Sequence, residues 1–186
     1  MSGLGHNRGP TMEKGRAWRR YAWTRARSEL MPTLPIEVAR RRVRRARELG
    51  LDYKSYAGIR AATGRDIIAL IFSSNALRLL RETAEMDELR REKISKIIDV
   101  TSLALVHPPH HPATVTKVNA LIERAERAPG LSQTWAETRA RVLALKGTLP
   151  GDGVVVIGET SLEREWSEAG RLAGFLHADT YFSVTS

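Results

Sequence analysis

The sequence contains no cysteine among its 186 residues, and this absence excludes several kinds of chemistry. Without thiols the chain can form no disulfide, no Cys-ligated zinc or iron–sulfur site and no thiol nucleophile. Long apolar runs are also lacking: the longest, at 67–72 and 154–157, are far shorter than the roughly 20 residues of a membrane-spanning helix. The first residues lack the apolar core of a secretory signal, so we expect a cytoplasmic protein with no membrane span.

Three common site motifs are missing as well. The sequence has no GxGxxG fingerprint and no Walker phosphate loop, and no GxSxG motif marks a serine nucleophile. We therefore predict no dinucleotide, no other bound cofactor and no serine-hydrolase site.

The charge that is present is unevenly distributed. The chain has 30 Lys plus Arg, 21 Asp plus Glu and a net charge of +9, in an otherwise ordinary composition that is 42% hydrophobic. Residues 1–65 hold 16 of the basic and 5 of the acidic residues, a net charge of +11, and the remainder is at −2. Codon bias can explain why most cations are Arg, but it cannot explain why the excess lies in the first third.

Hydrophobic periodicity predicts an α/β fold with a layered, mostly parallel sheet of about four strands and flanking helices. We expect a flexible arm over 1–10, a basic helical region over 11–64 and an α/β domain over 65–186, alternatively continuous with 11–64. The expected helices are 11–30, 35–50, 52–63, 75–90 (alternatively 75–99), 113–128, 132–146 and 160–176, and the expected strands are 67–72, 102–107, 154–157 and 180–185. Trp135, Trp166, Leu172 and Phe175 are expected in the core.

An alternative interpretation makes 67–80 one helix, so that 56–80 forms a helix-turn-helix. We disfavour it because Arg60 stands where that motif needs a small residue, and Arg65 stands where it needs an apolar one.

The helix over 35–50 carries arginines around nearly all of the circumference outside its apolar stripe. Guanidinium groups match phosphate geometry, and an aromatic ring among them can stack on a base. We therefore expect a nucleic-acid-associated accessory or regulatory protein. The residues expected to contact nucleic acid are Arg16, Arg20, Trp23, Arg40, Arg41, Arg44 and Arg45. The alternatives are a solvated face with Trp23 packed inward, pairing with an acidic partner protein or with the chain's own acidic segment 82–92, and binding to acidic lipid.

Polar residues follow two of the expected strands. Ser73 and Asn75 follow the first, and Glu159 and Thr160 follow the third. Ligands of parallel sheets bind at the carboxyl ends of strands, where helix N-termini offer N–H groups. A second hypothesis is therefore a small-molecule or nucleotide-binding enzyme with Ser73, Asn75 and Thr160 as ligand-binding residues. The simpler alternative is that these residues are only helix caps.

The loop over 107–112 holds three of the five histidines. His107, His110 and His111 have no carboxylate among them, and such sites normally need one, so we predict no metal. His107 and Glu159 are the candidate catalytic acid or base residues.

Overall fold

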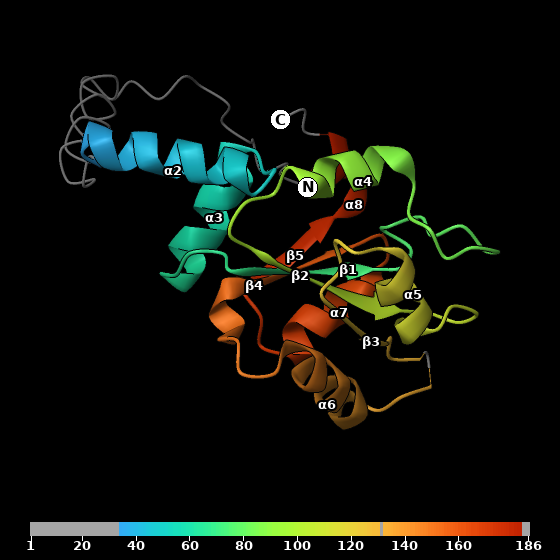
Figure 1. The fold of residues 1–186 in the computed structure, drawn as a ribbon. Helices are drawn as coiled ribbons and strands as arrows, with labels where there is room; N and C mark the ends of the chain where they lie inside the picture. Colours follow the sequence, from blue (N-terminus) through green and yellow to red (C-terminus); the bar gives the residue numbers. More distant parts are fainter. Residues whose placement is uncertain (1–33, 131, 184–186) are drawn as a thin grey trace, which may run out of the picture. The chain divides into compact units, whose positions relative to one another are not determined.

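The computed structural model describes residues 34–130 and 132–183 (Figure 1). The chain divides into two units, 1–39 and 40–186, and each is treated separately. Of the first unit, only residues 34–39 are described, and they contain the start of a helix. The second unit contains the sheet, and α3 belongs to this unit too.

Five parallel strands form the sheet within the described residues, in the order β3-β2-β1-β4-β5. Their bounds are β1 (Ala69–Ser73), β2 (Thr101–Val106), β3 (Arg124–Arg127), β4 (Val154–Gly158) and β5 (Gly174–His177). The predicted α/β fold with a parallel sheet is confirmed, with five strands instead of about four. Because β1 is a strand, the helix-turn-helix alternative is excluded.

Helices cover both faces of this sheet. Their bounds are α2 (Ile36–Glu48), α3 (Tyr53–Thr63), α4 (Glu88–Ser95), α5 (Pro112–Val118), α6 (Trp135–Lys146), α7 (Ser161–Ala169) and α8 (Ala178–Ser183). In Figure 1, α6 and α7 lie below the sheet, whereas α4 and α8 lie above it.

The central strands are buried on both faces, which explains their continuous apolar runs. Leu70 and Phe72 of β1 point to one face and pack with residues of α2, α3, α4 and α8. Ala69 and Ile71 point to the other face and pack with α6 and α7, including the fully buried Trp166. Because successive side chains of a strand point to opposite faces of the sheet, the core consists of two layers.

Local signals set several helix boundaries where the sequence predicts them. The Asp52 side chain accepts a hydrogen bond from Ser55 N, and Gly64 ends α3 in a left-handed conformation with φ 73°. Thr160 and Glu163 form a reciprocal capping box at the start of α7. All three predicted boundaries are confirmed.

The helix predicted directly after β1 is wrong. Ser73 Oγ accepts a hydrogen bond from Ala76 N, and Arg78 adopts a positive φ of 47°, so the chain turns instead. A helix forms only later, as α4. The side chains of Ser73 and Asn75 consequently do not cap a helix N-terminus.

The helix predicted over 113–128 is also wrong in its second half, which contains β3. Asn119 ends α5, and its side chain accepts from Met86 N and donates to the Ala84 carbonyl. These tertiary bonds hold the chain in a turn, from which β3 pairs with β2.

The elements predicted near the C-terminus are wrong, because a strand forms where we expected a helix and a helix forms where we expected a strand. Residues 174–177 form β5 beside β4, although we expected helix there, and the expected strand over 180–185 begins as α8. The helix ends early because Gly170 caps α7 and Arg171 takes a positive φ of 50°.

Of the four residues expected in the core, Trp135 lies outside it. Trp135 is 52% exposed, contrary to expectation, because it occupies the first turn of α6 next to the cap. Trp166 is buried as predicted, and Leu172 and Phe175 pack against the same cluster.

Candidate functional sites: an arginine face and a sheet edge

Helix α2 presents four arginines on one exposed face. Arg40, Arg44 and Arg47 follow one another at helical spacing, and Arg41 flanks them. The Arg44 side chain is 74% exposed, and its ion pair with Glu48 is long at 3.7 Å. Among residues 34–130 and 132–183, Arg41 and Arg47 have no ion pair. We name these four residues the arginine face.

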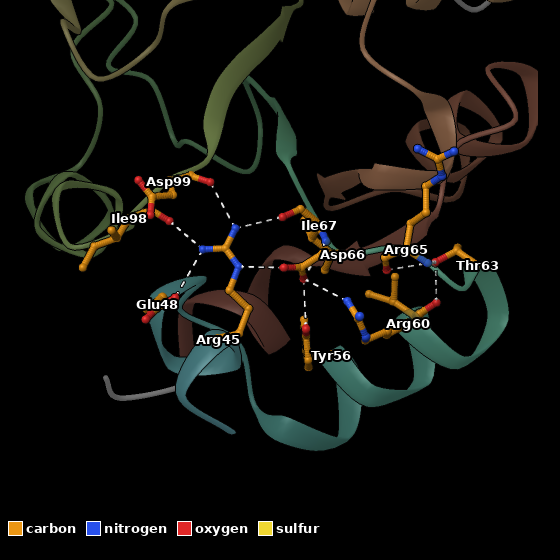
Figure 2. Close-up of polar contacts among 11 residues, drawn as sticks. Arg45, Glu48, Tyr56, Arg60, Thr63, Arg65, Asp66, Ile67, Ile98 and Asp99 are labelled. Atoms are coloured by element: carbon orange, nitrogen blue, oxygen red, sulfur yellow. Dashed lines mark hydrogen bonds and ion pairs between the residues drawn. The ribbon is translucent and has the colours of Figure 1, made fainter. Parts of the chain in front are cut away.

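The Arg45 side chain points toward the segments that lead into β1 and β2 (Figure 2). Its Nε donates to Asp66 at 3.1 Å, and its two terminal nitrogens donate to the Glu48 carboxylate and to three backbone carbonyls. Those carbonyls belong to Ile67, Ile98 and Asp99, at 3.0 to 3.1 Å. A guanidinium has five N–H groups, and here each can have an acceptor. Arg45 is therefore a structural anchor, and we leave it out of the expected phosphate contacts.

Asp66 is the centre of the same network, just before β1 (Figure 2). Besides Arg45, it accepts a hydrogen bond of 2.9 Å from Tyr56 Oη and forms an ion pair with Arg60 at 3.6 Å. Burial, with the Asp66 carboxylate beside it, raises the pKa of Tyr56. The network lies where β1 and β2 begin, so α2 is fixed at the amino edge of the sheet.

Arg16, Arg20 and Trp23, the remaining predicted nucleic-acid contacts, lie outside the described residues. The arginine face carries three of the predicted residues, Arg40, Arg41 and Arg44. It adds Arg47, which helical spacing could have indicated.

The second candidate site lies at the opposite, carboxyl edge of the sheet, between β1 and β4. The strand order places β2 and β4 on opposite sides of β1, so successive strands extend the sheet in opposite directions from this point. In doubly wound sheets, ligands bind at such a switch point. Glu163 of α7 is fully buried at this edge. Glu163 is not among the site residues that the sequence predicts.

One oxygen of Glu163 holds two of the predicted site residues. Oε1 accepts from Asn75 Nδ2 at 2.8 Å and lies 3.1 Å from His107 Nε2. The His107 ring packs against Trp166, with ring centroids 5.4 Å apart, and the main-chain N–H of His107 donates to Ser74 Oγ. The loops after β1 and β2 and the start of α7 therefore meet at one carboxylate.

The other oxygen of Glu163 occupies the N-terminus of α7. Oε2 accepts from the main-chain N–H groups of Glu159 and Thr160, at 2.6 and 3.2 Å. Burial raises the pKa of Glu163, but hydrogen bonds from His107, Glu159, Thr160 and Ser73 outweigh it, so the net pKa is lowered. Glu163 is thus an ionised carboxylate, located where an anionic ligand of this helix would bind.

More charged groups surround this edge. Arg78 lies 3.8 Å from the carboxylates of both Glu159 and Asp179, and His177 Nε2 lies 3.0 Å from the Glu159 carbonyl oxygen. The structure brings Ser73, Asn75, His107, Glu159 and Thr160 together, as the second hypothesis requires. Glu163 and Arg78 were not predicted as site residues; the TxxE spacing at 160–163 signals the first of them.

Comparisons with protein-family models, curated proteins and solved structures found no match. The function must therefore be argued from the two sites.

Two further observations on the described residues concern metal binding and membrane spans. They contain no group of three or more His, Asp or Glu arranged to hold a metal ion. Within the same residues, none of the helices has the length and apolarity needed to cross a bilayer.

Proposed function

We propose that the protein is a cytoplasmic, nucleic-acid-associated accessory or regulatory protein that binds the phosphate backbone through the arginine face of α2. The supporting observation is that four guanidinium groups share an exposed face of a helix whose inner side Arg45 fixes to the sheet. A fixed helix presents its charges in a constant geometry, which lowers the entropy cost of binding.

A polyanion would relieve the repulsion between like charges along the arginine face. Arg40 and Arg44 are four residues apart and Arg44 and Arg47 are three apart, so their like charges repel along the helix. From Arg40 to Arg47 the helix rises about 10 Å, so the face can meet more than one phosphate. Contacts with several phosphates release counterions, which drives binding.

Three carboxylates of the chain's own acidic segment already pair with local cations. In α4, Glu88 pairs with Arg91 and Glu92 pairs with Lys96, and Asp87 before the helix pairs with the buried Arg90. Because these carboxylates have local cations, the positive charge of α2 favours a separate polyanion.

The test is a fluorescence-anisotropy titration of a labelled 20-base-pair DNA duplex and of one of its strands with the full chain over a salt series. We expect affinity to fall with salt, with a log–log slope of about −3 for three or four phosphate contacts to the duplex. Replacing Arg40, Arg41, Arg44 and Arg47 by Gln should weaken binding at least about tenfold at low salt and flatten the slope.

A matched variant controls for net charge. Arg81, Arg124, Arg127 and Arg139 are also exposed, and replacing them by Gln removes the same charge from other parts of the surface. This control should bind like the wild type. Equal binding by both variants, or no binding by the wild type at low salt, would overturn the proposal.

A further inference from the structure

The bonding of Glu163 determines which nitrogen of His107 carries its proton. The carboxylate is ionised and can only accept hydrogen bonds, so the 3.1 Å contact requires a proton on His107 Nε2. In the neutral ring, Nδ1 then holds the free electron pair. No described residue bonds Nδ1, and this nitrogen is not among the fully buried unpartnered atoms. Since the side chain is 23% exposed, Nδ1 is open to a ligand.

The surroundings of His107 do not suit a phosphate. The first N–H groups of α7 already bind Glu163, so they are not available to an anion. The carboxylates of Glu159, Glu163 and Asp179 outnumber the guanidinium of Arg78, and the buried Arg90 nearby is paired with Asp87. This edge is therefore negative overall and repels a second anion.

The exposed groups suit hydroxyls instead. Asn75 donates its amide to Glu163, which leaves its Oδ1 as an acceptor, and the Glu159 carboxylate is 31% exposed. Arg78, 58% exposed, supplies donors at the same edge. A hydroxyl group both donates and accepts, so a molecule with several hydroxyls can satisfy this mixture of acceptors and donors.

We propose that the carboxyl edge between β1 and β4 is a site for an uncharged, polyhydroxylated small molecule, with His107 as a hydrogen-bond acceptor for it and Glu163 as the positioning residue. A ligand hydroxyl donates a hydrogen bond to His107 Nδ1, and the ligand stays uncharged. His107 Nε2–H donates to Glu163, which holds the ring in the tautomer that leaves Nδ1 free to accept. The site lies at the opposite edge of the sheet from the Arg45 anchor and does not depend on nucleic-acid binding.

The Glu163→Gln variant tests the positioning role. The main-chain N–H groups of Glu159 and Thr160 need an acceptor, so the Gln oxygen should take the place of Oε2 and its NH₂ should face His107. Nε2 must then accept, and the proton moves to Nδ1. Long-range ¹H–¹⁵N NMR should show an Nε2–H tautomer of His107 in the wild type and Nδ1–H in the variant. Glu165→Gln, an exposed position on the same helix, is the matched control and should keep Nε2–H.

Chemical modification with diethyl pyrocarbonate tests whether His107 Nδ1 is accessible to a reagent. The Nδ1 electron pair forms a bond to one carbonyl carbon, the bridging C–O bond breaks, and ethyl carbonate leaves. Peptide mapping should show that His107 reacts at least as fast as the more exposed His111, and about tenfold slower in Glu163→Gln. A purely structural His107 would react slowest of the described histidines.

Protection from the reagent identifies the ligand class. An excess of myo-inositol should slow modification of His107, whereas inorganic phosphate at matched ionic strength should not. Protection by phosphate, or by neither compound, overturns the polyol assignment. An Nδ1–H tautomer in the wild type, or slow modification of His107, overturns the role of His107 Nδ1 as the hydrogen-bond acceptor. The wild-type measurements suffice if the variant fails to fold, and replacing the arginine face by Gln should leave all of them unchanged.

Discussion

Arg45 Nε lies 3.1 Å from Asp66 Oδ2, and this contact joins α2 to the segment that leads into β1. The two residues are 21 positions apart, and the Arg45 side chain is 15% exposed. The same guanidinium reaches the carbonyls of Ile98 and Asp99 before β2. One side chain therefore connects the helix to the starts of two neighbouring strands, whereas Arg41, Arg44 and Arg47 are exposed.

Replacing Arg45 by Ala should destabilise the fold by about 3 kcal/mol, because Asp66 and three carbonyls lose a charged donor in a partly buried position. Urea denaturation measures the change. Arg44→Ala is the control on the same helix, and it should cost no more than about 0.5 kcal/mol because that side chain is 74% exposed. Equal effects of the two substitutions would contradict the anchoring role.

Lys93 should make stability depend on pH. It is 8% exposed, donates to the Tyr181 carbonyl and lies 4.6 Å from the Tyr181 ring centroid. Burial lowers the pKa of Lys93 to about 8 from 10.5. Between these values the unfolded chain binds more protons than the folded one, so stability rises with pH. From pH 7.5 to 9.5 the wild type should gain about 1–2 kcal/mol relative to Lys93→Met, measured by urea denaturation. Parallel pH profiles of the two proteins would contradict this.

The predictable parts of the fold are those that short-range signals determine. The apolar runs at β1, β2 and β4 admit few alternatives because both sheet faces are buried, and Asp52 and Gly64 mark the ends of α3 through local bonds. In contrast, β3 reads Arg-Ala-Glu-Arg and has no strand pattern of its own. It is a strand because Asn119 ends α5 through bonds to residues more than 30 positions away.

The sequence predicts most residues of the sheet-edge site, but it does not predict Glu163, which connects them. Ser73, Asn75, His107, Glu159 and Thr160 all lie at the end of a strand or just after it, and parallel strands bring such residues to one edge. Glu163 is the third residue of α7, where the sequence offers a sufficient local role as a capping partner. Its contact with His107, 56 positions away, depends on how the loop after β2 packs over α7, and no periodicity encodes that.

Gly158 at the end of β4 keeps room for the Glu163 carboxylate. A Cβ at this position would lie 2.7 Å from Glu163 Oε2 and 2.8 Å from a ring carbon of Phe175. Gly158→Ala should therefore cost about 1–3 kcal/mol and displace the carboxylate from His107. Gly58, in the interior of α3, provides the opposite case, because a Cβ there meets no atom within 4 Å. Gly58→Ala should stabilise the fold by about 0.5–1 kcal/mol through helix propensity. Thermal unfolding of both variants measures the two shifts, and NMR of the His107 ring should respond to the first substitution alone. Equal and small effects would show that the sheet edge tolerates a shifted Glu163, which would contradict the tight packing inferred for this position.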